Sequence, residues 1–259
     1  MTGSPPHSPQ SLVGQVALVT GAARGLGWEI AHQLAMLGAE VIVGARDKEK
    51  ADEAAGRIDG RGGVAVGLKL DVVNEADRRD AASFLDAAYG RLDILVNNAA
   101  VYLDSPDAAT PAFKLASETP EHLLRTTFDA NFFAPIQLTQ QVLPLMRRSE
   151  AGRIVNLSSV RGSLTLQADP TSPVYPNKAL AYDASKTALN AFSLQLADEL
   201  RDTPIKVNAI HPGWVRTQMS SEHADLSLED GAKTAVMYAT LPRDGPTGGF
   251  FYLDQKLPW

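Results

Sequence analysis

The chain has 259 residues, of which 44% are hydrophobic and 21% are charged, a composition typical of a globular protein. It contains no cysteine, which excludes disulfides and thiolate metal sites. Its net charge of −6 argues against a nucleic-acid binder, because such a protein needs a basic face. The length suits one large α/β domain better than two small ones.

The first segment, residues 1–11, carries three prolines and no apolar run. We expect it to be a disordered tail rather than a signal peptide. No later stretch approaches about 18 uninterrupted apolar residues, so no membrane-spanning helix is expected. These features predict a cytoplasmic protein with neither a membrane nor a nucleic acid as partner.

Short apolar runs alternate along the rest of the chain with segments of helical periodicity. Strands are predicted at residues 16–20, 41–43, 64–70, 92–96, 153–157, 205–210 and 249–253. Helices are predicted at residues 26–37, 47–58, 75–89, 119–146 and 181–200. Apolar strands separated by helices predict a doubly wound α/β fold over residues 12–259, with a seven-stranded parallel sheet and helices on both faces. Two long loops, residues 102–117 and 162–180, are expected at the carboxyl ends of the strands, where ligands bind in such sheets.

A glycine-rich turn joins the first strand to the first helix, with the sequence Thr20-Gly21-Ala22-Ala23-Arg24-Gly25-Leu26-Gly27. Glycines allow a tight turn and let the backbone approach a pyrophosphate at the helix N-terminus. A turn of this kind also occurs without a ligand, but its place in the first βαβ unit favours a dinucleotide. The sequence therefore predicts a Rossmann fold.

The end of the second strand bears on the choice of dinucleotide. NAD-binding proteins usually carry an acidic residue here for the ribose 2′-hydroxyl, and none precedes Asp47. Arg24 and Arg46 could instead bind a 2′-phosphate, which favours NADP(H). Two alternatives remain: both arginines could be solvated surface charges, and a small backbone shift could bring Asp47 to the ribose.

Tyr182 and Lys186 lie four residues apart in a predicted helix and so share one face. An ammonium group beside a phenol favours the phenolate, so we expect the pKa of Tyr182 to fall below its usual value of about 10. A phenol of this kind is a general acid/base for a carbonyl or alcohol oxygen. Taken alone, the pair could equally be two surface residues.

Further motifs accompany this pair, namely the glycine turn, Asn97-Asn98-Ala99-Ala100, Asn131, and Asn156-Leu157-Ser158-Ser159. Their order and spacing resemble the short-chain dehydrogenase/reductase family over nearly the whole chain. Ser159 and Tyr182 are 23 positions apart, and the loop between them carries Pro170, Pro173 and Pro176. This insertion resembles that of the NADPH-dependent carbonyl reductase branch. In that branch the insertion lies against helices through which other members dimerise, so a monomer and a homo-oligomer both stay open.

The resemblance implies four catalytic residues. Tyr182 would exchange a proton with the substrate oxygen, and Lys186 would hold the nicotinamide ribose and lower the tyrosine pKa. Ser159 would hydrogen-bond the substrate oxygen, whereas Ser158 is expected to bond backbone. Asn131 would position a water that relays protons from Lys186 to solvent.

The resemblance also implies a set of cofactor contacts along one edge of the sheet. The glycine turn would surround the phosphates and the adenosine ribose. Asp71 and Val72 would contact the adenine, and the loop after the sixth strand would contact the carboxamide. The whole predicted set is Gly21, Arg24, Gly25, Leu26, Gly27, Arg46, Asp71, Val72, Asn98, Ala99, Tyr182, Lys186, Pro212, Gly213, Val215 and Thr217.

Other residues carry weaker expectations. None of the five histidines has metal-ligand spacing, so no metal is predicted. His211 is expected to make structural hydrogen bonds rather than to touch the nicotinamide. Trp214 and Met219 fall in the segment that would cover the substrate, and Trp214 could either line the pocket or pack under the loop. Candidate pocket walls are Tyr102 and Tyr175; candidate core residues are Phe132 and Phe133.

The predicted activity is hydride transfer between NADP(H) and a small carbonyl or imine compound, or the corresponding alcohol. Two alternatives share the fold: an alcohol dehydrogenase working mainly in oxidation, and a reductase of acyl-carrier thioesters. The second would need a basic patch for its carrier protein, which an acidic chain disfavours. A non-catalytic NADP(H)-binding sensor is a third alternative, disfavoured because all four catalytic residues are present.

Overall fold

The computed structural model describes residues 11–104, 115–217 and 224–259. The segment predicted to be a disordered tail lies outside the described residues except for Ser11, which is exposed. Met219 also lies outside them. Within the described part of the chain, no helix is both long and apolar enough to cross a membrane.

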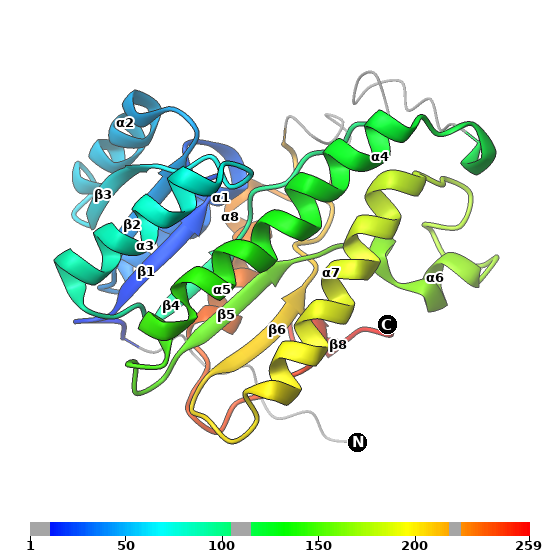
Figure 1. The fold of residues 1–259 in the computed structure, drawn as a ribbon. Helices are drawn as coiled ribbons and strands as arrows, with labels where there is room; N and C mark the ends of the chain where they lie inside the picture. Colours follow the sequence, from blue (N-terminus) through cyan, green and yellow to red (C-terminus); the bar gives the residue numbers. More distant parts are fainter. Residues whose placement is uncertain (1–10, 105–114, 218–223) are drawn as a thin grey trace.

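The centre of the molecule is one twisted sheet (Figure 1). Its strands follow the order β3-β2-β1-β4-β5-β6-β7-β8, and those from β3 to β7 pair in parallel. Their bounds are β1 Val16–Thr20, β2 Glu40–Ala45, β3 Val64–Lys69, β4 Ile94–Asn97, β5 Arg153–Leu157, β6 Lys206–Ile210, β7 Phe250–Tyr252 and β8 Gln255–Lys256. The seven predicted parallel strands are confirmed. The prediction missed the two-residue β8, which turns back to pair antiparallel with β7.

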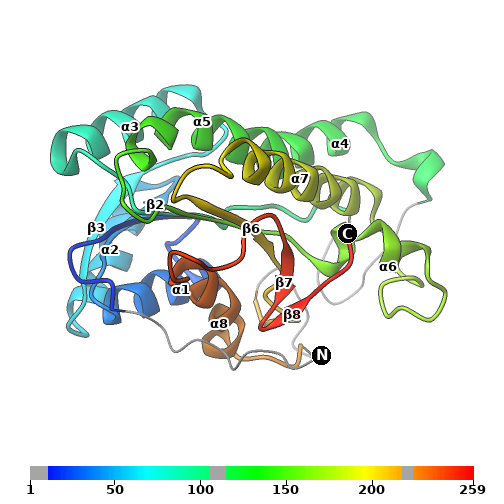
Figure 2. The ribbon, with the colours of Figure 1, turned by 90° about the horizontal axis from the view of Figure 1, so that it is seen from below.

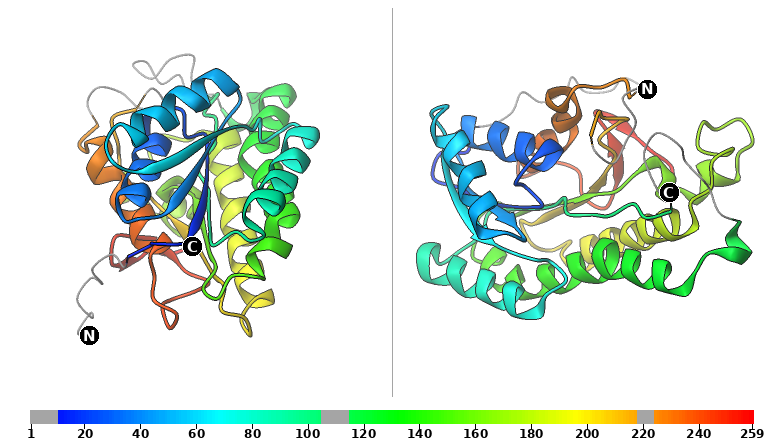
Figure 3. Two further views of the ribbon diagram at one scale, coloured as in Figure 1. Left: turned by 90° about the vertical axis from the view of Figure 1, so that its left-hand side faces the viewer. Right: turned by 90° about the horizontal axis from the view of Figure 1, so that it is seen from above.

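Helices cover both faces of this sheet (Figures 2 and 3). One face carries α1 Gly25–Met36, α2 Lys48–Asp59 and α8 Leu228–Ala239, whose apolar side chains form one hydrophobic core against the sheet. The other carries α3 Glu75–Tyr89, α4 Glu121–Phe128, α5 Ala134–Met146 and α7 Leu180–Glu199, and a second core lies beneath them. The expected doubly wound Rossmann-like architecture is confirmed.

Two helical regions differ from the prediction. The expected helix over residues 119–146 is divided by a π-helical segment, η2 Asp129–Phe133, so α4 and α5 are separate helices. Phe133 in this segment is exposed, and its assignment to the core was wrong. Helix α8 was not predicted at all, although Ser227 caps it by accepting a hydrogen bond from Asp230 N. That spacing of a serine and an acidic residue is a recognisable start signal.

The long loop between β5 and α7 also contains structure. It holds a 3-10 turn, η3 Val160–Gly162, and a short helix, α6 Leu164–Ala168. A second 3-10 turn, η1 Ala116–Glu118, precedes α4. The sequence had indicated only loops here, because segments this short carry too few periodic residues to be recognised.

The outermost parallel strand, β3, has a side chain bonded to its free edge. Ala65 N donates to Asp59 Oδ1 over 2.8 Å, from the end of α2. The opposite end of the sheet is closed by the short β7–β8 hairpin. At one edge of the sheet a side chain thus occupies a backbone amide of β3, and at the other edge the last strand is only two residues long.

Buried amides link the strands that lead to the candidate site. Asn97 Nδ2 at the end of β4 donates to Asn156 Oδ1 on β5 over 2.8 Å, and Asn156 Nδ2 donates to Ser193 Oγ on α7 over 2.8 Å. Buried polar groups need such partners to offset their lost hydration. The chain of bonds fixes α7 against the carboxyl ends of β4 and β5.

Candidate active site

A cleft of about 2650 Å³ runs along the carboxyl ends of the parallel strands. Every predicted cofactor residue lines it, as do Ser159 and the pocket candidates Tyr102 and Trp214. Trp214 is 51% exposed, which favours a place on the cleft wall over packing beneath the loop. Tyr175 does not line the cleft. The Lys178 ammonium lies over the Tyr175 ring instead, 4.6 Å from the ring centre. Its assignment as a pocket wall was wrong.

The glycine turn forms the floor of one end of this cleft. A Cβ atom on Gly27 would lie 2.4 Å from Asn98 Nδ2 and 2.5 Å from Gly21 O, so only glycine lets α1 pack this closely on the end of β4. Gly25 has a φ of +58° and open space around its Cβ position. The first turn of α1 has neither an acidic residue nor a side-chain cap. Its amides are therefore suited to hold an anion such as a pyrophosphate.

The residues that predict NADP(H) lie beside this turn. Arg24 and Arg46 are both exposed and line the cleft, and no side-chain ion pair or hydrogen bond within the described ranges engages either guanidinium group. Asp47 caps α2 by accepting a hydrogen bond from Lys50 N over 3.2 Å. Its carboxylate thus has a structural partner, which weakens the alternative that it binds a ribose. The donors and the open turn together fit a dinucleotide carrying a 2′-phosphate.

Threonine and asparagine side chains hold the turn in place. Thr20 Oγ1 accepts hydrogen bonds from Asn98 N and Ala99 N, each over 3.0 Å. Asn98 Nδ2 in turn donates to Thr20 O over 2.7 Å. The part played by Thr20 was missed at the sequence level, because these bonds join residues nearly 80 positions apart.

Tyr182 and Lys186 project from α7 into the other end of the cleft, with the Lys186 ammonium 5.5 Å from the Tyr182 ring centre. Lys186 Nζ donates to Leu157 O over 2.8 Å. The side chain of Ser159, which follows β5, lies beside Tyr182 and favours the ionised form of its phenol. Ser158 Oγ contacts Lys186 O instead, at 3.5 Å. The structure therefore brings Ser159, rather than Ser158, to the phenol.

The expected lowering of the Tyr182 pKa is wrong for this structure. Burial raises the pKa of Tyr182 to about 12, although the Arg161 charge and the Ser159 hydrogen bond act in the opposite direction. Burial also lowers the pKa of Lys186 to about 7. Lys186 does not contribute to lowering the tyrosine pKa here, because burial disfavours the charged form of the lysine as well. Near neutral pH the proton resides on the phenol, which is the form needed to donate it.

Asn131 lies behind the cleft, in the π-helical segment η2. Its Nδ2 donates to Val101 O over 2.8 Å and to Ser185 Oγ over 3.1 Å, and its Oδ1 accepts from Val101 N over 2.8 Å. The amide therefore joins the loop after β4 to α7. Its predicted part in a proton relay stays a prediction.

His211 follows β6 and lines the cleft. Burial lowers its pKa to about 4, so the ring is neutral at physiological pH. The ring packs on Tyr252, with centroids 5.5 Å apart, and Nδ1 has no hydrogen-bond partner among the described residues. The structural hydrogen bond expected of this side chain is not found at Nδ1.

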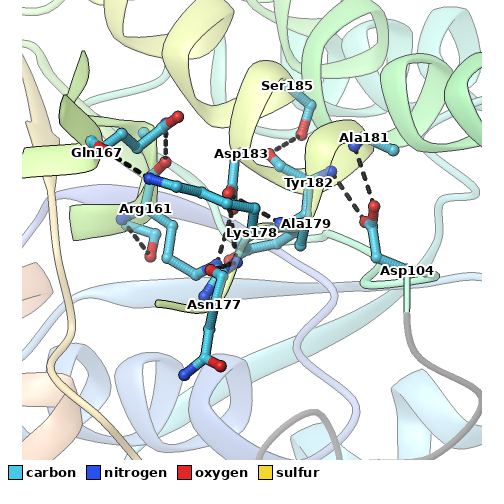
Figure 4. A network of polar contacts seen from close by, with 12 residues as sticks. Asp104, Arg161, Gln167, Asn177, Lys178, Ala179, Ala181, Tyr182, Asp183 and Ser185 are labelled. Atoms are coloured by element: carbon cyan, nitrogen blue, oxygen red, sulfur yellow. Dashed lines mark hydrogen bonds and ion pairs between the residues drawn. The ribbon is translucent and has the colours of Figure 1, made fainter. Parts of the chain in front are cut away.

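Two charged residues that the sequence did not single out stand close to Tyr182 (Figure 4). Arg161 forms an ion pair of 2.7 Å with Asp183 and donates to Asn177 O over 2.7 Å, which fixes the insertion against α7. Asp104 accepts hydrogen bonds from the backbone of α7. Neither residue belongs to a local motif, and both act across long stretches of chain.

The arrangement matches that of known proteins. The general model of the short chain dehydrogenase family matches residues 15–226. Carbonyl reductase (NADPH) 1 of Mus musculus is 32% identical, in an alignment that covers 94% of this chain and 98% of the relative.

Solved structures agree with this. A metagenomic short-chain oxidoreductase in complex with NADP is 32% identical with a TM-score of 0.72, covering 91% of this chain and 95% of that one. Salutaridine reductase from Papaver somniferum is 28% identical with a TM-score of 0.76, covering 92% of this chain and 99% of that one. The family motifs lie together in one cleft, and the family model matches most of this chain. The chain therefore belongs to the short-chain dehydrogenase/reductase family of oxidoreductases.

Proposed function

We propose that this protein is an NADP(H)-dependent reductase of small carbonyl or imine compounds, with Tyr182 as the general acid/base. The observation that carries the proposal is that Tyr182, Ser159 and Lys186 line the same cleft as the open glycine turn, with the Lys186 ammonium 5.5 Å from the Tyr182 ring centre. A proton donor and a dinucleotide cradle in one cleft are the two parts that a carbonyl reduction requires.

The cofactor end of the cleft supports NADP(H). The amides at the start of α1 would hold the pyrophosphate, and Arg24 and Arg46 would hold the 2′-phosphate through charge-assisted bonds. When bound, the nicotinamide would supply a hydride to the substrate carbon. The NADPH in the name of the mouse relative and the NADP in the solved metagenomic oxidoreductase support the same choice.

The catalytic end supports proton donation to the substrate oxygen. Because burial raises the pKa of Tyr182 to about 12, the phenol is protonated at neutral pH and donates its proton as the oxygen gains charge. The Ser159 hydroxyl would hydrogen-bond the same oxygen and hold it beside Tyr182. Lys186 would bond the nicotinamide ribose, and Asn131 is proposed to hold the water that returns a proton from solvent.

The walls near Tyr182 indicate the kind of substrate. Aromatic and apolar side chains are among those that line the cleft, including Tyr102, Val174 and Trp214. The Tyr102 ring stands edge-on to that of Tyr182, with centroids 5.1 Å apart. A compound whose carbonyl or imine carbon is attached to apolar groups would suit these walls.

The experiment compares NADPH and NADH oxidation against a panel of ketones, aldehydes and cyclic imines. Tyr182→Phe is expected to reduce turnover by more than about 100-fold while NADPH binding stays within twofold, because only the proton donor is removed. Tyr175→Phe is the matched control, since this tyrosine does not line the cleft.

Retained turnover in Tyr182→Phe refutes the mechanism, and a preference for NADH refutes the role of the arginine pair. Tight NADPH binding with no turnover on the panel would favour the sensor alternative. Oxidation of alcohols without reduction of carbonyls would favour the dehydrogenase alternative.

A further inference from the structure

A short segment after β4 is bonded to the catalytic helix and to the segment behind it. The backbone N–H of Val101 donates to the side-chain amide of Asn131, and its backbone C=O accepts from the same amide, each over 2.8 Å. The Tyr102 ring contacts the Tyr182 ring edge-on. Asp104, three residues after Val101, is 6% exposed, and its carboxylate accepts hydrogen bonds from Ala181 N and Tyr182 N, each over 3.0 Å (Figure 4).

These two bonds supply the hydrogen-bond acceptors that the first backbone N–H groups of α7 need and that its own N-cap residue does not offer. The first turn of any helix has backbone N–H groups without intrahelical partners. The N-cap residue of α7, Ala179, has no side chain that can accept them. Asp104 provides both oxygens from 77 positions away in the sequence, and its negative charge also suits the positive end of a helix dipole.

One of the two bonded amides belongs to Tyr182 itself. The other contacts around this turn fix neighbouring atoms: Asp183 Oδ2 accepts from Ala179 N over 3.1 Å, and Arg161 pairs with Asp183. Asp104 is therefore the side chain that bonds the backbone carrying the phenol. Asp104 does not line the cleft, so it is not placed to touch the substrate or the cofactor.

We propose that Asp104 is a positioning residue for Tyr182: its carboxylate fixes the first turn of α7 and so holds the phenol on the side of the cleft where Ser159 lies and where the substrate oxygen would accept its proton. The inference rests on the proposed function, in which Tyr182 is the proton donor. A misplacement of about 1 Å at a reacting group costs as much as about 100-fold in rate. The effect of losing Asp104 should therefore appear in kcat, while the affinity for NADPH, set at the other end of the cleft, should change little.

The test compares Asp104→Ala and Asp104→Asn with a matched control, Asn74→Ala. Asn74 Oδ1 also accepts two amide bonds at a helix start, from Ala76 N and Asp77 N of α3, away from Tyr182. We expect Asp104→Ala to lower kcat by at least about tenfold with the NADPH dissociation constant within twofold. Asp104→Asn keeps one acceptor oxygen and should restore part of the loss. Asn74→Ala should lower the melting temperature comparably and leave kcat within twofold.

Hydrogen exchange gives a readout that does not depend on turnover. In Asp104→Ala the amides of Ala181 and Tyr182 should exchange at least about tenfold faster than in the wild type, while those in the middle of α7 keep their rates. If Asp104→Ala does not fold, Asp104→Asn serves for both measurements.

Three results would overturn the proposal: an unchanged kcat in the Asp104 variants, an equal loss of kcat in Asn74→Ala, or unchanged exchange at Ala181 and Tyr182. A failure of the proposed function looks different. In that case the wild type would not reduce the panel, or Tyr182→Phe would keep wild-type turnover, while faster exchange in the Asp104 variants would still support the structural half of the inference.

Discussion

Removing Arg24 or Arg46 tests the assignment of the cofactor most directly. Both side chains are exposed and have no side-chain partner among the described residues, so truncation to alanine leaves no buried charge unpaired. The loss is then that of a charge-assisted bond to a phosphate, about 1.5–3 kcal/mol when shielded and closer to about 1 kcal/mol at an exposed site. At about 1.4 kcal/mol per tenfold, each single variant should lower kcat/KM for NADPH by about five- to tenfold.

The double variant should show whether the two arginines bind one group. If both hold the same phosphate, Arg24→Ala/Arg46→Ala should deviate from the sum of the single effects, because the sites are coupled. The values of kcat/KM for NADH should stay within about twofold in all three variants, since NADH lacks the phosphate. Arg79→Ala is the control, an exposed arginine of α3 that pairs with Glu75 and does not line the cleft.

The assay is initial-rate oxidation of NADPH and NADH with one carbonyl substrate, and Asp47→Asn completes the series. Because the amide oxygen of the asparagine can accept the same cap bond from Lys50 N, Asp47→Asn should keep its stability, and it should also keep the ratio between the two cofactors. Equal losses with NADPH and NADH in the arginine variants, or a selective loss of NADH activity in Asp47→Asn, would refute the reasoning.

Three further predictions concern buried and exposed residues around the cleft. Lys186→Met should abolish turnover yet raise the melting temperature at pH 7. Burial lowers the Lys186 pKa to about 7, so the wild type loses stability as pH falls from about 10.5 to 7. The gain in melting temperature should therefore shrink toward pH 10, and a lower melting temperature of the variant at pH 7 contradicts the prediction. Arg153→Met should destabilise the protein by about 3 kcal/mol in urea unfolding, because the buried guanidinium donates to three backbone carbonyls, of Gly152, Pro204 and Leu241; a loss below about 1 kcal/mol would show that these carbonyls find other partners. Trp214→Ala should raise KM for apolar carbonyl substrates several-fold with NADPH binding unchanged, and an equal change in NADPH affinity would place the indole at the cofactor instead.

The parts of the fold that the sequence predicted depend on local patterns. The apolar strands and the glycine turn were identified because each is a run of adjacent residues whose spacing determines its structure. The places of Tyr182, Lys186 and Ser159 in one cleft followed from motifs at the ends of neighbouring strands and from one helix face.

The parts that were missed depend on contacts far apart in the sequence or on burial. The π-helical turn at Asn131 spaces its backbone hydrogen bonds five residues apart instead of four, a difference that an apolar pattern does not resolve. The cap that Asp104 provides spans 77 positions, and no local signal indicates its partner. The direction of the Tyr182 pKa was wrong because the cost of burying the phenolate exceeds the neighbouring favourable contacts, and burial is not visible in a four-residue spacing. Helix α8 is different, since the cap at Ser227 was readable and was overlooked.

The two ends of the sheet bear on how the protein behaves in concentrated solution. An open edge strand offers its unpaired amides to other chains and so initiates aggregation. On β3, Asp59 occupies one of these amides, that of Ala65, and places a carboxylate where an incoming strand would have to pair. At the other end, β8 is only two residues long and carries the charge of Lys256. The sheet thus resists edge-to-edge association at both ends, and a loss of solubility in Asp59→Ala, with the fold intact, would be the expected sign of a newly exposed edge.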